Sequence, residues 1–90
     1  MSTSHVTVRY WAAARSAAGT DHDALPVDGP VTLADVVRQV AAAHPGARMA
    51  GVLEVCSILV GDRPVSTVDP VEVEIRPGDE VQFLPPFAGG

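Results

Sequence analysis

The stretch RPGDEVQFLPPFAGG (residues 76–90) decides how this chain can fold. It opens with Pro-Gly-Asp, a composition typical of a tight turn. In Glu80–Leu84, Val81 and Phe83 alternate with polar or outward-facing residues, which predicts a strand with one buried face. Pro85 and Pro86 have no backbone N–H to donate, so the strand cannot continue through them. We therefore expect a folded domain over residues 1–84 and an extended tail over residues 85–90.

The sequence also predicts a hairpin at the other end of the chain. VTVRYW (residues 6–11) alternates, with Val6, Val8 and Tyr10 on one face. Residues 23–27 can return as a second strand after an alanine-rich segment and a turn. Because both strands have an apolar face, we expect them to pair and to contribute to the same core.

A single long helix is predicted between residues 32 and 45. Thr32 is a good N-cap, Asp35 places an acid in the first turn, and Pro45-Gly46 forces a stop. The apolar residues between them recur on one helical face: Leu33, Val36, Val37, Val40 and Ala41. A helix with one buried stripe packs against a sheet rather than standing free.

The middle of the chain is less regular. Residues 47–53 suggest a short second helical turn that ends near Gly51. Residues 55–60 form a dense apolar run containing Cys56, which we interpret as a largely buried central strand. A turn at 61–64 then leads to a short partner strand at 65–66, and residues 67–75 are expected to be irregular.

These elements define an α+β fold. The order is ββαβ(β)β, a mixed sheet of four to five strands with one main helix on one face. If the first and last strands lie side by side in the middle of that sheet, the arrangement is a β-grasp. The pattern makes this topology plausible without selecting it uniquely.

Composition narrows the possible functions. Ninety residues are enough for one domain. Eleven acidic side chains against six arginines, with no lysine, give a net charge of −5. This balance argues against nucleic acid or an anionic membrane as the main partner and favours a partner with a basic patch. No stretch approaches the ~20 apolar residues of a membrane span, so we expect a cytoplasmic protein.

The chain offers few candidates for catalysis. Cys56 is the single cysteine, which excludes an internal disulfide, and its apolar surroundings predict a buried structural thiol. The histidines, His5, His22 and His44, lack the spacing of metal ligands, so no metal site is predicted. The Asp79-Glu80 pair fits turn chemistry. Without a Ser-His-Asp constellation or a P-loop, we expect this chain not to be an enzyme.

A larger set of motifs now resembles a known family. These are the opening 8–15 with Gly19, the capped helix from Thr32-Leu33, the turn 61–65 and the ending 76–90. Together they look like the MoaD/ThiS sulfur carriers, which are ubiquitin-like β-grasp proteins. The ending makes the chain more similar to MoaD, the small subunit of molybdopterin synthase, than to ThiS. Gly61 stands where many relatives have Asn.

The resemblance implies a role for the tail. An E1-like activating enzyme would use ATP to adenylate the Gly90 carboxylate, which is then converted to a thiocarboxylate. The sulfur would pass to a molybdopterin precursor on a larger, MoaE-like synthase subunit. The carrier itself would bind no cofactor.

Other tail residues would serve the partner. Gly89 and Ala88 keep the arm slim, Phe87 anchors it, and Pro85 and Pro86 stiffen its base. Leu84 and Trp11 are candidate docking residues, although ordinary packing on the sheet face explains these two equally well.

Several alternatives stay open on sequence alone. The carrier could serve another acceptor, such as the thiamin thiazole, cysteine or a sulfur-containing natural product. It could instead be a ubiquitin-like protein modifier, or an interaction module with an inert, frayed tail. The sulfur donor and the oligomeric state are not defined by the sequence.

Overall fold

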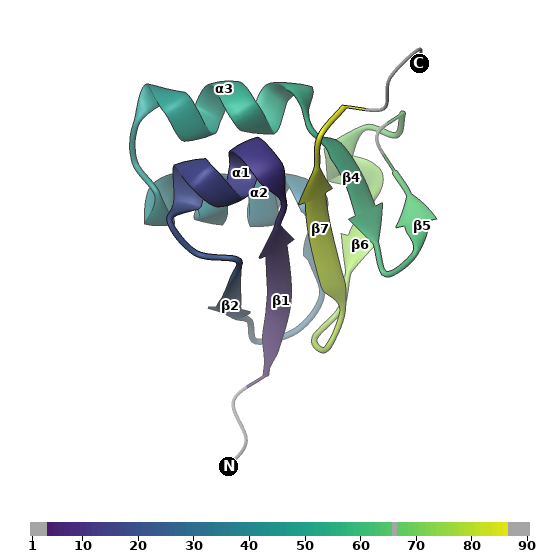
Figure 1. The fold of residues 1–90 in the computed structure, drawn as a ribbon. Helices are drawn as coiled ribbons and strands as arrows, with labels where there is room; N and C mark the ends of the chain where they lie inside the picture. The colour runs from purple at the N-terminus through teal and green to yellow at the C-terminus, as the bar shows by residue number, and fades with distance from the viewer. Residues whose placement is uncertain (1–3, 66, 87–90) are drawn as a thin grey trace.

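The computed structural model describes residues 4–65 and 67–86, and Figure 1 shows their arrangement. Five strands form a mixed sheet in the order β2-β1-β7-β4-β5. Their bounds are β1 His5–Tyr10, β2 His22–Pro26, β4 Ser57–Val60, β5 Arg63–Pro64 and β7 Glu80–Leu84. The other elements are β3 Val31–Thr32, β6 Glu74–Ile75, the helices α1 Ala12–Ala18, α2 Leu33–Ala43 and α3 Ala47–Val55, and the 3-10 turn η1 Pro70–Glu72.

The predicted pairing of the first and last strands is confirmed. β1 and β7 run parallel, with Thr7 opposite Glu80 and Tyr10 opposite Phe83. The predicted hairpin is also present, because β2 pairs antiparallel with β1 on its other side. The chain therefore has the β-grasp topology, with β7 at the centre of the sheet (Figure 1).

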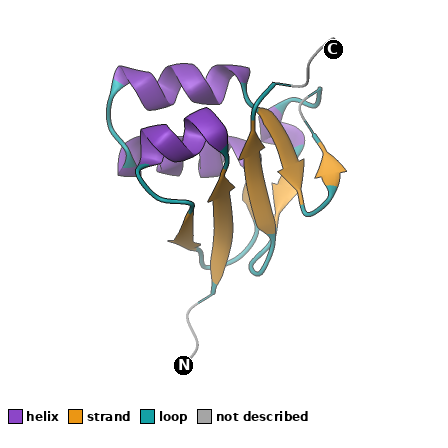
Figure 2. Cartoon of the chain, in the orientation of Figure 1, coloured by secondary structure: helices purple, strands orange, loops and turns teal. Residues whose placement is uncertain are grey.

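The core lies between this sheet and the helices, which gather on one side of it in Figure 2. Val81 and Phe83 of β7 are fully buried, as predicted from their alternation. The predicted stripe of α2 faces them, with its central residues Leu33, Val36 and Val40 also fully buried. The apolar face of β7 and the apolar stripe of α2 thus belong to the same core layer.

The N-terminus of α2 is closed by a reciprocal pair of hydrogen bonds. The backbone N–H of Asp35 donates to Thr32 Oγ1 at 3.1 Å, and the N–H of Thr32 donates to Asp35 Oδ2 at 3.1 Å. Arg38 also contacts the Asp35 carboxylate. This capping box satisfies two backbone donors that a helix end leaves without partners.

The prediction for residues 47–53 was wrong in extent. α3 continues through Gly51 to Val55, and Cys56 ends it as the C-cap. Burial of Met49 and Leu53 against the core explains the continuation, since tertiary packing outweighs the low helix propensity of one glycine. Val55, predicted to begin a strand, is instead a helical residue that is 61 % exposed.

The strands after α3 also differ from the prediction. β4 begins at Ser57, and it lies between β7 and β5 rather than at the sheet centre. Its partner strand is at 63–64, not 65–66, and Ser66 lies outside the described residues. The cause is the two-residue turn, in which Gly61 has φ of 62° and brings Arg63 directly opposite Val60.

The segment predicted as irregular contains regular structure. Asp69 caps η1 by accepting a hydrogen bond from the N–H of Val71 at 3.1 Å. β6 then pairs with β3 to form a second, two-stranded sheet, Val31 opposite Ile75. In the part of the chain that the structure describes, none of the helices is long and apolar enough to cross a membrane.

Replacing Thr32 with Ala should lower the free energy of unfolding by about 1 kcal/mol, because the capping box loses its hydroxyl acceptor. Urea unfolding followed by circular dichroism measures this. Thr67→Ala, at an exposed position, is the matched control and should change stability by less than about 0.5 kcal/mol. Equal losses in both variants would contradict the role given to the cap.

Candidate functional site

The candidate site is the end of the sheet from which the tail leaves. The N–H of Trp11 donates to the carbonyl of Phe83 at 3.0 Å, so Trp11 continues the β1–β7 ladder beyond β1. Leu84 is the next residue of β7 and pairs with Ser57 of β4. Trp11 is 45 % exposed and Leu84 is half-buried. The structure therefore brings these two predicted docking residues to adjacent strands at one end of the sheet.

Polar contacts on the outer sheet face hold the indole in place. Trp11 Nε1 donates to Gln82 Oε1 at 3.1 Å, and Gln82 Nε2 donates to the carbonyl of Gly61 at 3.2 Å. The Arg9 guanidinium lies 5.8 Å from the Trp11 ring centroid and 3.8 Å from the Glu80 carboxylate. Trp11 is thus an exposed aromatic with a fixed orientation, a property that reduces the entropy lost when a partner binds it.

The tail begins directly after this surface. Pro85 and Pro86 are exposed and follow β7 without strand pairing. The remaining predicted site residues, Phe87, Ala88, Gly89 and Gly90, lie outside the described residues.

A partly buried hydrogen-bond network lies at the C-terminal end of α2, and the sequence did not predict it. Tyr10 Oη donates to Asp23 Oδ2 at 2.8 Å, and His44 Nε2 lies 2.6 Å from the same oxygen. The Tyr10 and His44 rings meet edge to face with centroids 5.6 Å apart. The three residues are distant in sequence: Tyr10 and Asp23 come from the paired strands β1 and β2, and His44 is the C-cap of α2. Sequence spacing therefore carried no signal for the network.

The network shifts two pKa values. Burial, assisted by the hydrogen bond to Asp23, raises the pKa of Tyr10 well above its usual value. Partial burial opposes the ionisation of Asp23, but the hydrogen bonds from His44 and Tyr10 outweigh it and lower the pKa of Asp23. The charged carboxylate is therefore the form that the fold stabilises.

The structure also places Cys56 and Asp79, two other residues considered from the sequence. Cys56 is half-buried at the end of α3 rather than inside a strand, and burial raises the pKa of its thiol. Asp79 Oδ2 accepts a hydrogen bond from the N–H of Arg76 at 2.8 Å, which closes the turn before β7 as predicted. Across the two described ranges, 4–65 and 67–86, no group of three or more His, Cys, Asp and Glu side chains could hold a metal ion.

Comparison with known proteins identifies the family to which this β-grasp chain belongs. A family model described as the ThiS family matches residues 8–90. The chain belongs to the ThiS family. The molybdopterin synthase sulfur carrier subunit of Aspergillus niger is 33 % identical over 91 residues and all of both chains. The subunit of the same name from Chlamydomonas reinhardtii is 28 % identical over 94 % of this chain and 98 % of its own.

Solved structures repeat the fold. The HVO 2177 protein of Haloferax volcanii has a TM-score of 0.77 at 28 % identity, over 98 % of this chain and 88 % of its own. Small archaeal modifier protein 1 of Methanosarcina acetivorans has a TM-score of 0.74 at 22 % identity over the whole of both chains, a likeness of fold alone. A chain of the BexX/CysO complex of Amycolatopsis orientalis has a TM-score of 0.66 at 25 % identity, over 94 % of this chain and 99 % of its own.

Asp23→Asn should cost about 1–3 kcal/mol of unfolding free energy at pH 7, because Tyr10 and His44 lose a charged acceptor. The folded-state pKa of Asp23 is depressed, so its contribution is fully present above the unfolded pKa near 4 and is lost as the pH falls through the folded value. The difference between wild type and variant should therefore shrink on going from pH 7 to pH 3. Urea unfolding at both pH values measures it, and a pH-independent difference would refute the assignment.

Proposed function

We propose that this chain is a sulfur carrier that works with molybdopterin synthase. The observation that carries the proposal is the family match, which runs through the tail to residue 90. The full-length similarity to two proteins named molybdopterin synthase sulfur carrier subunit supports the choice of pathway. The exposure of Trp11, which is hydrogen-bonded to Phe83 just before Pro85, supports it further.

The proposed reaction takes place at the carboxylate of Gly90. This group is ionised at pH 7 and is a poor acyl donor, so it must first be activated. The carboxylate oxygen attacks the α-phosphate of ATP, which forms an acyl-adenylate and releases pyrophosphate. Hydrosulfide or an equivalent sulfur nucleophile then attacks the acyl carbon, AMP leaves, and the product is a thiocarboxylate.

The chain supplies the reacting carboxylate and the surface that its partners recognise, while those partners supply the catalysis. Six residues, 85–90, span up to about 20 Å when extended, enough to enter a partner's active site. Nucleotide binding belongs to an E1-like activating enzyme in this proposal. Release of the sulfur to the molybdopterin precursor belongs to a larger, MoaE-like synthase subunit. The carrier is therefore a non-catalytic subunit.

The docking surface proposed for these partners is the pair Trp11 and Leu84. Interface hot spots are enriched in aromatic residues that are ordered before binding, and Trp11 meets both conditions. Pro85 and Pro86 restrict the first residues of the arm, which lowers the entropy lost on insertion. Phe87, Ala88 and Gly89 are proposed to follow inside the partner's channel.

Incubation with ATP, sulfide and the activating enzyme of the same organism should convert the chain to its thiocarboxylate. Intact-mass spectrometry should then show the gain expected when one oxygen atom is exchanged for sulfur. A chain lacking Gly90 should fold normally by circular dichroism and show no gain. Loading of that shortened chain would refute the assignment of Gly90, and conjugates on lysines of other proteins would favour the modifier alternative.

Trp11→Ala should weaken binding to the larger synthase subunit at least tenfold, because the surface loses its ordered aromatic side chain. Calorimetric titration of the folded variant measures the affinity. Val71→Ala removes a residue that is 61 % exposed on η1 and serves as the control. If both variants bind as tightly as wild type, the docking surface lies elsewhere.

A further inference from the structure

The backbone of Trp11 is held on both sides. Its N–H donates to the carbonyl of Phe83 at 3.0 Å, and its carbonyl accepts from the N–H of Ala14 at 3.0 Å. The next residue, Ala12, has φ of 50°, a left-handed conformation that is unfavourable for residues other than glycine and persists where surrounding contacts impose it. Because the backbone is fixed, the remaining freedom of Trp11 is rotation about its side-chain bonds.

Gln82 restricts that rotation. It is half-buried on the outer face of β7, between its opposite residues Arg9 on β1 and Leu59 on β4. Its Oε1 accepts from Trp11 Nε1 at 3.1 Å, and its Nε2 donates to the carbonyl of Gly61 at 3.2 Å. Only this orientation of the amide satisfies both partners, because the indole nitrogen can only donate and the carbonyl can only accept. The amide therefore cannot turn over without losing both hydrogen bonds.

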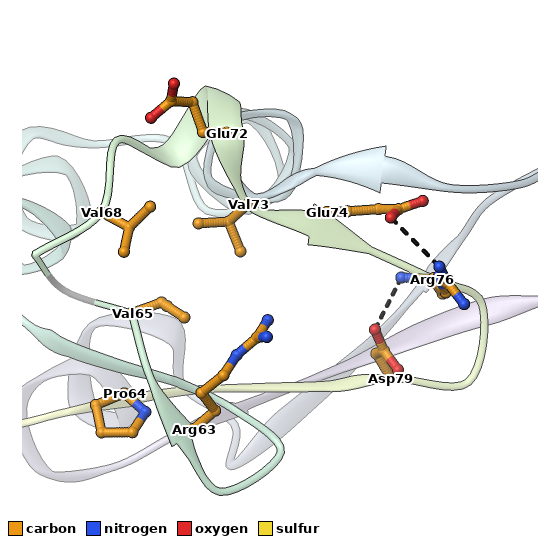
Figure 3. A pocket seen from close by; sticks show the side chains of 9 residues that line it. All are labelled: Arg63, Pro64, Val65, Val68, Glu72, Val73, Glu74, Arg76 and Asp79. Atoms are coloured by element: carbon orange, nitrogen blue, oxygen red, sulfur yellow. Dashed lines mark hydrogen bonds and ion pairs between the residues drawn. The ribbon is translucent and has the colours of Figure 1, made fainter.

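The β4–β5 turn, which Gln82 contacts, is itself anchored to β7. The N–H of Gly61 donates to the carbonyl of Glu80 at 2.8 Å. Just beyond the turn, Figure 3 shows the Arg63 guanidinium over a neighbouring cleft of about 520 Å³, between Val65 and Val73. Arg63 thus extends away from Gln82, and the Gly61 carbonyl is the group that the turn offers to the amide. The hydrogen bond from Gln82 therefore ends at a fixed point of the sheet.

Arg9 contacts the indole in a less directional way. Its guanidinium carbon lies 5.8 Å from the centroid of the Trp11 ring, and one of its nitrogens lies 3.8 Å from the Glu80 carboxylate. Exposed ion pairs of this kind are weak, and a cation over a ring tolerates rotation of the ring in its own plane. A hydrogen bond from the indole nitrogen does not tolerate it, because the bond requires alignment with the acceptor. Gln82 is therefore the residue that sets the direction in which the indole points.

We propose that Gln82 is a positioning residue for partner docking. By tying the indole of Trp11 to the β4–β5 turn, it presents the ring in one orientation before the partner arrives. A side chain that is ordered in the free protein loses less entropy on binding. The proposal rests on the proposed function, since the partner is the larger synthase subunit that was assigned there to Trp11.

The first test is made on the free chain. Trp11 is the single tryptophan, so the indole N–H gives one signal in a nitrogen-15 spectrum. Gln82→Leu removes both hydrogen bonds, and the order parameter of the indole nitrogen should fall. The control is Thr7→Val, which also replaces a polar side chain with an apolar one on the outer sheet face and should keep the wild-type order. Unchanged order in Gln82→Leu would overturn the proposal.

Affinity for the larger synthase subunit is the second readout, and calorimetry measures it. Gln82→Leu should bind about fivefold more weakly, through a less favourable binding entropy, while its stability in urea matches that of the control. A loss of indole order with wild-type affinity would show that the orientation is not used in docking, and it would overturn the proposal. An equal loss of affinity in Thr7→Val would also overturn it, because the effect would then belong to the sheet face in general.

Gln82→Glu separates the two hydrogen bonds. At pH 7 its carboxylate can accept from the indole nitrogen but has no hydrogen to donate to the Gly61 carbonyl. The order of the indole should therefore fall toward that of Gln82→Leu. Wild-type order in this variant would overturn the link to the β4–β5 turn.

Failure of this inference can be told apart from failure of the proposed function. If wild type is loaded with sulfur and Gln82→Leu binds the synthase subunit as tightly as wild type, the inference fails and the proposed function stands. If wild type is neither loaded nor bound by that subunit, the proposed function fails, and the inference fails with it.

Discussion

The parallel pairing of β1 with β7 holds the sheet, the core and the surface at the tail root in register. It joins the two ends of the domain, so the sheet forms only when nearly the whole chain is in place. It also aligns Tyr10 with Phe83, whose stacked rings lie with centroids 6.2 Å apart, at the centre of the core. Because Trp11 follows Tyr10 and Leu84 follows Phe83, the same register sets the surface at the tail root.

Both edges of the five-stranded sheet carry a proline. The N–H of Val27 donates to Ser4, and the N–H of Val65 donates to Ile58, so strand alternation turns the nitrogens of Pro26 and Pro64 away from the sheet. A proline nitrogen in that position cannot donate to an added strand. Addition of a further strand is therefore disfavoured at both edges of this sheet.

The sequence was most informative where local pattern and tertiary packing agree. Thr32, Asp35 and the apolar stripe of α2 made that helix predictable, and Val81 with Phe83 made β7 predictable. Gly51 misled the prediction of α3 because burial of Leu53 depends on the sheet beneath it. The Tyr10–Asp23–His44 network could not be predicted, because it depends on a strand register and a helix end that no short window of sequence contains.

The tail and the exposed surface at its root meet two requirements that conflict. In the proposed function the tail slides into an enclosed site and leaves again, which favours small side chains and few strong contacts. Recognition of the correct partner instead requires charge and shape, which Trp11 and the Arg9–Glu80 pair beside it can provide without entering that site. A carrier that served more than one enzyme would gain from this division, because the sheet face could set the affinity while the tail remained free to enter and to release.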